Sequence, residues 1–327
     1  MIKKEKVAFL KDLKVGYKAG DKAMYYGRNS KLENQYWHQG ILVSHIDNLQ
    51  NVKTIDIGII GYVCDEGVKR NQGRIGARKG PKSIRNKLGK LPIHFKDKKI
   101  TDFGDIVCID KNLEDCQKAL SKTISMCITN NIFPIAIGGG HDIAYANFNG
   151  IKDALKNISK NKIGIINFDA HFDLRAVETQ PNSGTPFNQI LTENNDVAYF
   201  AIGIQQQSNP KELFEIAVKK NVSYVSNFDC ETFSDALKIK LNTFIKEVDY
   251  VYITIDMDGF SSAYAPGVSA PSTLGLTPNF VYKVLAFLFQ SKKVISCDIA
   301  ELNPDFDVDD STAGLAARLV DYIVQIS

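Results

Sequence analysis

The stretch Lys162-Ile-Gly-Ile-Ile-Asn-Phe168, followed by Asp169-Ala-His171-Phe-Asp173, decides the fold. Its first part is apolar at successive positions rather than at alternate ones, which indicates a strand that is covered on both faces. Such strands belong to parallel sheets. The polar residues that follow would then lie at the carboxyl end of the sheet, where α/β proteins bind ligands.

Similar β-branched, apolar runs recur along the chain, and helix-length segments separate them. The predicted strands are Ile55–Val63, Ile132–Ile137, Lys162–Phe168, Val197–Gly203, Val222–Val225, Tyr250–Ile255 and Lys293–Ile299. The predicted helices are a segment that Pro81 opens and that ends at Leu88, and Leu113–Asn130, Ala144–Ser159, Glu231–Lys246, Pro278–Gln290 and Thr312–Ile326. This alternation implies right-handed βαβ units, and therefore an α/β fold with a mostly parallel central sheet in a three-layer sandwich.

The chain has 327 residues without an internal repeat or a Pro/Gly/Ser-rich linker, which favours a single domain. Residues 1–50 are less regular and contain the only tryptophan, Trp37. We expect them to form an N-terminal arm packed on a catalytic domain that spans residues 51–327.

Composition excludes several classes of protein. The 40 basic and 37 acidic side chains leave a formal charge of only +3, so nothing suggests a nucleic-acid partner. No apolar run reaches the ~18–20 residues that a membrane span needs. The start, Met1 to Lys6, is basic but has no apolar segment behind it, so a signal peptide is not expected. These features predict a cytoplasmic protein with a small-molecule substrate.

The six cysteines form no Cys-x-x-Cys pair. We expect reduced, mostly buried thiols rather than disulfides or a thiolate metal site. Of the five histidines, His141 and His171 follow predicted strands, whereas His38, His45 and His94 lie in the N-terminal part, where surface or packing roles are expected.

Three predicted strand ends carry polar residues of one chemical kind. The segments are Gly138-Gly-Gly-His141-Asp142, Asp169-Ala-His171-Phe-Asp173 and Asp256-Met-Asp258. Residues spaced by two in an extended chain point to the same side, so the second and third segments each gather their ligand-type side chains. So many carboxylates in one cleft would repel each other and raise each other's pKa values, and two divalent cations would cancel that charge. Oxygen and nitrogen ligands without thiolate suit Mn²⁺, with Zn²⁺, Fe²⁺, Co²⁺ or Ni²⁺ as alternatives.

Each segment alone has a simpler interpretation. A lone Asp-x-Asp is usually a solvated loop or a helix cap, and a lone Gly-Gly-Gly-His is a turn. A phosphate-binding loop is not supported, because the lysine and the Ser/Thr of that motif are missing after Gly138–Gly140. The three segments together, in this order and at strand ends, favour a metal site.

At this point the sequence resembles the ureohydrolase family of arginase, agmatinase and formimidoylglutamase. The resemblance rests on the three segments above and on Ala265-Pro-Gly267, Asp298-Ile-Ala-Glu301-Leu-Asn-Pro304 and Thr312-Ala-Gly-Leu-Ala316, and runs from about residue 55 to the C-terminus. It implies an arginase/deacetylase-like three-layer fold with two Mn²⁺ per subunit, and assemblies of several identical subunits.

The resemblance also assigns roles. His141, Asp169, Asp173 and Asp256 would hold one metal, and His171, Asp169, Asp256 and Asp258 the other, with Asp169 and Asp256 bridging. Two cations lower the pKa of a shared water, so a metal-bridged hydroxide would attack a carbon that bears nitrogens. Asp173 would carry the proton to the leaving nitrogen, and Glu301 would face the cationic nitrogen of the substrate.

Local features place the resemblance on the formimidoylglutamase branch. They are the loop Gly67-Val-Lys-Arg70-Asn71-Gln-Gly73-Arg74-Ile-Gly76-Ala77, the arginine in Asp173-Leu-Arg175, Ser183 where arginase and agmatinase carry a histidine, and Ala265-Pro-Gly-Val-Ser-Ala-Pro271. N-formimidoyl-L-glutamate has two carboxylates, which arginine side chains bind bidentately. The expected substrate-binding residues are therefore Arg70, Asn71, Arg74, Arg175, Ser183 and Glu301.

The implied reaction is hydrolysis of this substrate to L-glutamate and formamide in histidine degradation. Another ureohydrolase that releases urea from a guanidino acid, arginase-like or agmatinase-like, is the alternative. A binding or regulatory protein without catalysis is a third interpretation, which would be expected to have lost a ligand, yet all six candidate metal ligands are present. We expect no nucleic-acid or membrane partner and a homo-oligomer.

Overall fold

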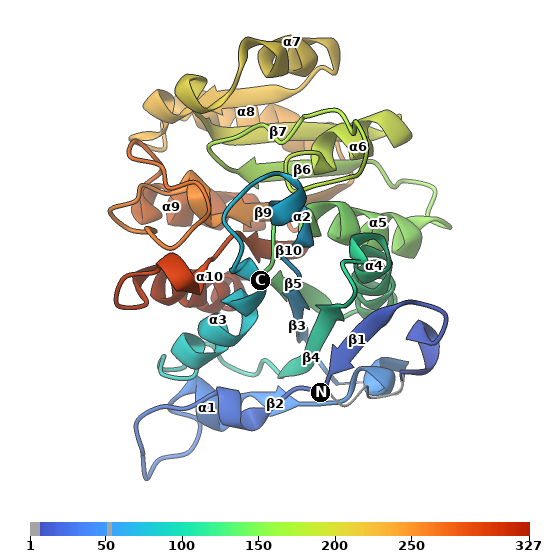
Figure 1. The fold of residues 1–327 in the computed structure, drawn as a ribbon. Helices are drawn as coiled ribbons and strands as arrows, with labels where there is room; N and C mark the ends of the chain where they lie inside the picture. Colours follow the sequence, from blue (N-terminus) through green and yellow to red (C-terminus); the bar gives the residue numbers. More distant parts are fainter. Residues whose placement is uncertain (1–6, 51–53) are drawn as a thin grey trace.

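A single sheet of ten strands forms the centre of the protein (Figure 1). The computed structural model describes residues 7–50 and 54–327. The strands are β1 (Val15–Lys18), β2 (Leu42–Val43), β3 (Ile57–Val63), β4 (Ile100–Cys108), β5 (Phe133–Ile137), β6 (Ile163–Phe168), β7 (Val197–Ile204), β8 (Ser223–Ser226), β9 (Tyr250–Asp256) and β10 (Val294–Ala300). Their order is β1-β4-β3-β5-β10-β9-β6-β7-β8, with β2 also paired to β4. Among these strands only the β1–β4 pairing is antiparallel.

Helices cover both faces of the sheet and form the outer layers (Figure 1). The helices are α1 (Trp37–Gly40), α2 (Glu66–Arg70), α3 (Gly80–Leu88), α4 (Leu113–Thr129), α5 (Ile143–Leu155), α6 (Pro186–Glu193), α7 (Lys211–Lys219), α8 (Asp235–Lys246), α9 (Pro278–Phe289) and α10 (Ser311–Ile326). One core cluster joins α3, α8, α9 and α10 to the sheet, and a second joins α4, α5, α6 and α7 to the opposite face. The predicted three-layer sandwich is confirmed.

The strand β9 shows why these sequences form central strands. Val251, Ile253 and Ile255 lie in one core cluster, whereas Tyr252 lies in the other. Both faces are therefore buried, and apolar residues are favoured at every position rather than at alternate ones. The seven strands predicted from such runs are all present, with ends shifted by at most two residues.

The predicted helices are also present, although several ends differ. The segment from Glu231 becomes helical only at Asp235, because the Ser234 side chain accepts the N–H of Leu237 and caps the helix there. The helix of residues 144–159 ends at Leu155. The short helices α2, α6 and α7 were not expected from the sequence.

The strand β4 was also not predicted from the sequence, because two aspartates in its centre interrupt the apolar pattern. Asp102 and Asp105 pair with the fully buried Arg85 of α3, with N–O distances of 2.7 and 2.5 Å. The Tyr25 hydroxyl donates a further hydrogen bond to Asp102 at 2.9 Å. These partners compensate the burial of the charges, so a polar sequence forms an interior strand.

The N-terminal segment adds to the sheet rather than only packing against it. Its strands β1 and β2 both pair with β4. Trp37 is completely buried, and its indole N–H donates to Asp321 of α10 at 2.7 Å. The basic start, Met1–Lys6, lies outside the described residues. The expected boundary between residues 50 and 51 lies at the edge of the undescribed residues 51–53.

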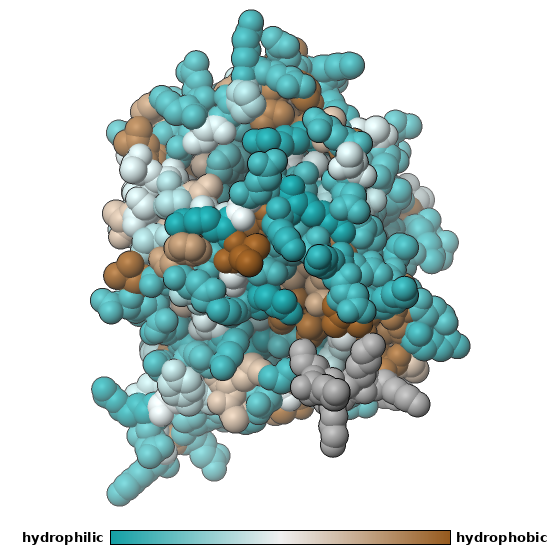
Figure 2. Space-filling view, viewed as in Figure 1, coloured by the Kyte–Doolittle hydropathy of each residue, from teal (hydrophilic) through white to brown (hydrophobic). Residues whose placement is uncertain are grey.

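Among the described residues, no helix has the length and apolarity that a membrane span requires. The face of the molecule in Figure 2 is mostly hydrophilic, with only small hydrophobic areas between polar side chains.

Candidate metal centre and its pocket

Four neighbouring strands, β5, β10, β9 and β6, end at the same edge of the sheet. The residue after β10 is Glu301, and His141 lies in the loop after β5. Asp256 ends β9 and Asp169 follows β6. Parallel register thus brings together segments that are far apart in the sequence.

The glycines before His141 form a turn that directs the His141 side chain into the site. Gly138 and Gly139 have φ angles of +82° and +80°, which glycine adopts without steric cost. A Cβ on Gly139 would lie 2.5 Å from a ring carbon of Tyr62. The turn leaves the His141 N–H in contact with Glu301 Oε1, at 2.8 Å.

Two acidic residues of the site have backbones in the left-handed region. The φ angles are +48° at Asp173 and +64° at Glu301. Non-glycine residues in this region are strained by roughly 1–3 kcal/mol, and such strain persists where the surroundings hold it. At Glu301 the hold is a hydrogen bond from its N–H to the carbonyl of Gly139, at 2.8 Å.

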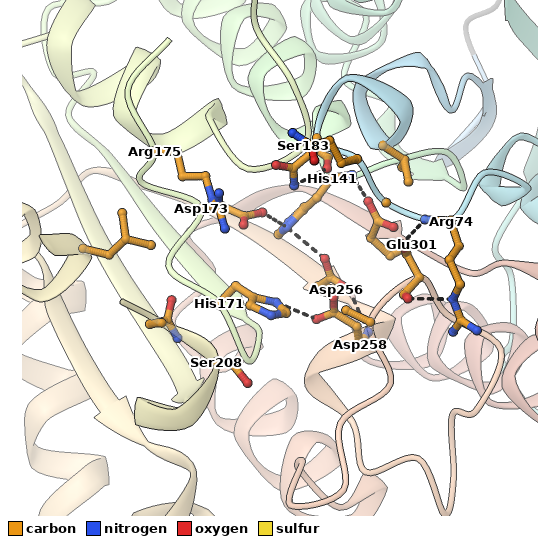
Figure 3. Close-up of a pocket in the computed structure, with 18 residues that line it drawn as sticks. Arg74, His141, His171, Asp173, Arg175, Ser183, Ser208, Asp256, Asp258 and Glu301 are labelled. Carbon is orange, nitrogen blue, oxygen red and sulfur yellow. Dashed lines mark hydrogen bonds and ion pairs between the residues drawn. The ribbon is translucent and has the colours of Figure 1, made fainter. Parts of the chain in front are cut away.

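The ligand-type side chains form two groups that share Asp169. The first group contains His141, Asp169, Asp173 and Asp256, and the second contains Asp169, His171 and Asp258. Within each group the ligand atoms all lie within 4.8 Å of one another. The structure therefore brings together all six predicted ligands, as Figure 3 shows for most of them.

Asp256 differs from its implied place in both metal sites. Its Oδ2 lies 3.0 Å from His141 Nδ1, in the first group, and its Oδ1 accepts the N–H of Asp258 at 2.7 Å. The second group does not include it. A bridging role for Asp256 stays a prediction.

The His141 ring is fixed by a chain of hydrogen bonds that the sequence did not reveal. Its Nε2 lies 2.9 Å from the hydroxyl of Thr254, and this hydroxyl donates to Asp298 Oδ1 at 2.6 Å. Asn147 donates to the other oxygen of Asp298 at 2.8 Å. The chain leaves Nδ1 of His141 pointing into the site, as supporting partners of metal-binding histidines usually do.

The surroundings of His141 Nδ1 fit a cation. Carboxylate oxygens of Asp173, Asp256 and Asp169 lie 2.9, 3.0 and 3.1 Å from it. A single ring nitrogen can donate to only one of them at a time. In addition, Oδ1 of Asp258 is buried and accepts no hydrogen bond from any described residue, although His171 Nδ1 lies 3.3 Å away. Buried oxygens without donors are what a metal ion would satisfy.

Burial and like charge distort the titration of these groups. Burial raises the pKa of Asp258 well above its usual value, and the charge of Asp256 adds to this rise. Burial and the Asp169 charge raise the pKa of Asp173 to about 6. Burial alone would lower the pKa of His141, but the charge of Asp256 and hydrogen bonds with Asp169 and Asp173 outweigh it and raise the pKa. Divalent cations would relieve this crowding of carboxylates.

A cavity of about 340 Å³ opens above the two groups. The side chains that line it, besides the ligands and Glu301, are Val68, Asn71, Gln72, Gly73, Arg74, Arg175, Ser183, Ser208, Asn209, Leu213, Ser269 and Ala270. The volume suits a small metabolite. Of these residues, the sequence indicated Asn71, Arg74, Arg175 and Ser183, whereas Gln72, Ser208, Asn209 and Leu213 follow no motif that would have revealed them.

Arg175 lies at the mouth of the cavity and is exposed. Its N–H donates to the carbonyl of Gly184 at 3.0 Å, and its Cδ packs near Gly184. Within the described part of the chain its guanidinium has no hydrogen-bond or ion-pair partner. The N–H groups of this guanidinium are therefore available to a ligand.

Arg74 lies on the opposite side of the cluster (Figure 3) but is engaged within the protein. Its Nε and Nη2 donate to the carbonyls of Ser269 and Val268, at 2.9 and 2.6 Å. Its guanidinium carbon lies 3.9 Å from the centre of the Phe306 ring. Arg74 thus holds the loop around Ser269 as one wall of the cavity.

The hydroxyl of Ser183 accepts a hydrogen bond from Asn71 Nδ2 at 3.1 Å. The N–H of Ser183 donates to the carbonyl of Gly67 at 3.1 Å. These contacts join the loop after β3 to the loop after β6, on the same side as Arg175.

The structure places Arg70 differently from the expectation. Arg70 does not line this cavity. It donates to Glu66 at 3.3 Å, to Glu114 at 2.6 Å and to the carbonyl of Pro181 at 3.2 Å. With its donors used in this way, Arg70 supports the loop that carries Ser183 instead of facing a substrate.

Sequence comparison identifies relatives over nearly the whole chain. The model of the arginase family matches residues 55–325. A formimidoylglutamase of Clostridium tetani is 41% identical, with 95% of this chain and 96% of the relative covered. A formimidoylglutamase of Legionella pneumophila is also 41% identical, with 93% and 96% covered.

Solved structures agree with the fold. A Trypanosoma cruzi formiminoglutamase with Mn²⁺ superposes with a TM-score of 0.76 at 25% identity, over 86% of this chain and 98% of the other. The formimidoylglutamase of Bacillus subtilis gives a TM-score of 0.78 at 22% identity, over 92% and 94%.

Proposed function

Because the chain belongs to the arginase family, we propose that its cavity binds N-formimidoyl-L-glutamate and that the chain hydrolyses it to L-glutamate and formamide. The protein is an enzyme, a formimidoylglutamase. The relatives that are about 40% identical over most of their length carry this activity in their names, which favours it over a urea-releasing reaction.

The observation that best supports this substrate is the Arg175 guanidinium, which has no hydrogen-bond or ion-pair partner among the described residues. It lies two residues after Asp173, which belongs to the first metal-ligand group. A substrate carbon held near the metals would therefore place a carboxylate a few atoms away within reach of the guanidinium. Bidentate pairing with a carboxylate is the geometry that arginine favours. Ser208 and Asn209, which also line the cavity, offer further polar contacts.

We further propose two Mn²⁺ per subunit. His141, Asp169, Asp173 and Asp256 would hold one ion, and Asp169, His171, Asp256 and Asp258 the other, with Asp169 and Asp256 shared between them. Oxygen and nitrogen donors without thiolate suit Mn²⁺, and the T. cruzi relative contains this metal. When bound, the paired cations lower the pKa of a water molecule and so supply a nucleophile near neutral pH.

The chain's own residues would orient the substrate and move the proton. Glu301 lines the cavity and uses Oε1 to accept the His141 N–H, which leaves its other oxygen for the cationic amidine nitrogen. Asp173 would take a proton and deliver it to the departing nitrogen, as general acid–base catalysis by a carboxylate requires.

The wider setting belongs to the same proposal. The reaction serves histidine degradation in the cytoplasm, and the enzyme works as a homo-oligomer without nucleic-acid or membrane partners.

A substrate panel tests the proposal. Protein stripped with a chelator and reloaded with Mn²⁺ is incubated with N-formimidoyl-L-glutamate, arginine, agmatine and 4-guanidinobutyrate, and formamide, urea and ammonia are measured. We expect formamide from the first compound alone, with the stripped protein inactive. Urea release from a guanidino compound at a higher kcat/KM would replace the proposal with the alternative ureohydrolase.

A further inference from the structure

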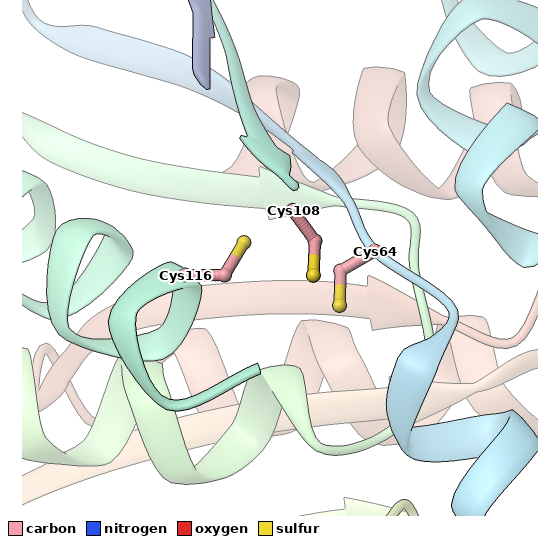
Figure 4. A group of neighbouring side chains, drawn as sticks. All are labelled: Cys64, Cys108 and Cys116. Atoms are coloured by element: carbon pink, nitrogen blue, oxygen red, sulfur yellow. The ribbon is translucent and has the colours of Figure 1, made fainter. Parts of the chain in front are cut away.

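Three cysteines from separate parts of the chain meet at the carboxyl ends of β3 and β4, beside α4 (Figure 4). Cys64 follows β3, Cys108 ends β4, and Cys116 lies in the first turns of α4. Their sulfur atoms all lie within 4.8 Å of one another. The register of β3 on β4, which pairs Val63 with Val107, brings Cys64 next to Cys108.

The surroundings favour a thiolate at Cys108 alone. The hydrogen bond with Cys108 raises the pKa of Cys64 to about 12, and burial raises the pKa of Cys116 well above its usual value. A metal ion would displace protons from these two thiols on binding. Cys64 and Cys116 are buried, whereas Cys108 is partly exposed and gives access from solvent. Hydrogen bonds from Cys116 and Cys64 lower the pKa of the Cys108 thiol. No disulfide joins any of the six cysteines.

We propose that Cys64, Cys108 and Cys116 form a further metal site, separate from the carboxylate centre, for a thiophilic cation such as Zn²⁺. Zinc binds thiolate sulfur at about 2.3 Å with tetrahedral geometry, which places two such sulfurs about 3.8 Å apart. The three sulfur atoms lie within 4.8 Å of one another, so rotation of the cysteine side chains would have to bring them to this value. Three protein sulfurs leave the fourth position to a water molecule, on the exposed side of Cys108.

Ligand chemistry separates the two kinds of site. Thiolates prefer Zn²⁺, Cd²⁺ or Cu⁺, whereas the oxygen-rich groups at the strand ends prefer harder ions such as Mn²⁺. None of the three cysteines lines the substrate cavity. The cysteine site can therefore fill while the catalytic ions stay in place.

The location predicts a structural effect. The carbonyl of Cys64 accepts the N–H of Gly140 at 3.1 Å, and Gln117, next to Cys116, donates to the carbonyl of Asp142 at 3.1 Å. These contacts hold both sides of His141. An ion that ties β3, β4 and α4 together would strengthen the support of this loop without taking part in the reaction.

The test uses Cd²⁺ as a spectroscopic probe on the full-length, Mn²⁺-loaded protein, reduced and freed of thiol reagents. Cadmium–thiolate charge transfer in the ultraviolet reports sulfur ligation, and metal analysis after desalting gives the stoichiometry. We expect one thiolate-bound Cd²⁺ per chain, and the same in Cys127→Ala, a control that removes a buried thiol of α4 outside the cluster. Cys108→Ala should bind it at least tenfold more weakly.

A second measurement on the unmodified chain keeps the test decisive if Cys108→Ala folds poorly. Cd²⁺ or Zn²⁺ should protect Cys108 from alkylation, as mapped by mass spectrometry, and chelation should restore the reaction. The proposal is overturned if the Mn²⁺-loaded protein shows no charge-transfer band. Equal binding by Cys108→Ala, or a disulfide between two of these cysteines in place of a retained metal, would overturn it as well.

Discussion

The floor of the substrate cavity is made of strand ends, whereas its rim is made of loops. In the floor, Asp169, Asp256 and His141 are buried, and each contacts another member of the metal-ligand groups. On the rim, Arg175 is exposed and Arg74 contacts backbone carbonyls of a neighbouring loop. The floor is thus fixed by the sheet, and the rim by a few side-chain contacts.

This difference separates the reaction from the substrate. The floor presents the groups that a metal-assisted hydrolysis needs, and these would serve any compound with a suitable carbon. Choice among such compounds falls to the rim, where two arginines with the same side chain do different work. Arg74 holds the loop around Ser269 in the cavity wall, whereas the N–H groups of Arg175 are available to a ligand. Changes in the floor should stop the reaction, while changes in the rim should alter affinity and choice.

The largest effect is expected from Asp169→Asn in the floor. Asp169 belongs to both metal-ligand groups, so the change removes charge from both. Turnover should fall to background, well beyond the ~10–100-fold loss that follows when a residue supporting a metal ligand is altered. Activity with saturating Mn²⁺ and metal content by elemental analysis check this.

A matched control is Asp235→Asn, which alters an aspartate on the surface of α8 paired with Lys238 at 2.8 Å. It should keep both activity and metal content. If Asp169→Asn retained two metals per chain and normal turnover, the two groups would not be a shared metal centre.

The floor is the part that the sequence could predict. Asp169, His171 and Asp173 follow a strand whose continuous apolar pattern is unambiguous, and the register of parallel strands then dictates their meeting with Asp256. The support that Thr254 and Asp298 give to His141 was not predicted, because both residues lie inside strands, where the pattern indicates only burial. Their polar side chains are accepted there because they satisfy each other and His141.

In the rim, Arg175→Ala should have the next largest effect. Arg175 is exposed in the free protein, but a bound substrate would cover its pair with the carboxylate, and loss of one partner from such a desolvated charge pair costs ~2–5 kcal/mol. At 1.36 kcal/mol per tenfold, kcat/KM for N-formimidoyl-L-glutamate should fall about 30- to several-thousand-fold. Metal content should not change, because no metal ligand is touched.

Arg175→Lys keeps the positive charge but loses the planar guanidinium. Its kcat/KM should therefore lie between those of the unmodified protein and Arg175→Ala. Normal turnover of N-formimidoyl-L-glutamate by Arg175→Ala would show that the arginine is structural. The argument for a dicarboxylate substrate would then rest on the relatives alone.

Arg74→Ala should have a smaller effect that appears mainly in KM. It removes two charged hydrogen bonds to the loop around Ser269 and the stacking on Phe306. Taking about 1–2 kcal/mol for contacts of this kind at a partly exposed site, kcat/KM should fall about 5–30-fold. Steady-state kinetics would separate the two roles: a loss as large as that of Arg175→Ala would mean that Arg74 binds substrate directly.

The rim is also where the sequence was least informative. Its loop arginines look alike in the sequence, and only the folded chain shows that Arg74 reaches the carbonyls of Val268 and Ser269, almost two hundred positions away. The cysteine cluster was missed for the same reason, because Cys64 and Cys108 meet only through the pairing of β3 with β4.

The smallest effect on catalysis is expected at Arg70, which the sequence suggested as a substrate residue. Arg70→Ala should leave kcat/KM near its normal value while lowering the thermal midpoint, because it removes the contacts with Glu66, Glu114 and the Pro181 carbonyl. A loss comparable to that of Arg175→Ala would return Arg70 to the substrate site.

The ion pair between Arg70 and Glu114 makes the stability of the fold depend on pH. The hydrogen bond from Arg70 lowers the pKa of Glu114 in the folded chain. A lowered carboxyl pKa stabilises the fold above the unfolded value, about 4.3 for glutamate, and this contribution is lost as pH falls through the folded value. Since Glu114 is 43% exposed, Glu114→Gln should cost only about 0.2–1 kcal/mol at pH 7. In denaturant titrations the difference from the unmodified protein should shrink as the pH drops below about 4. A difference that stayed constant with pH would mean that packing, rather than charge, joins Arg70 to α4.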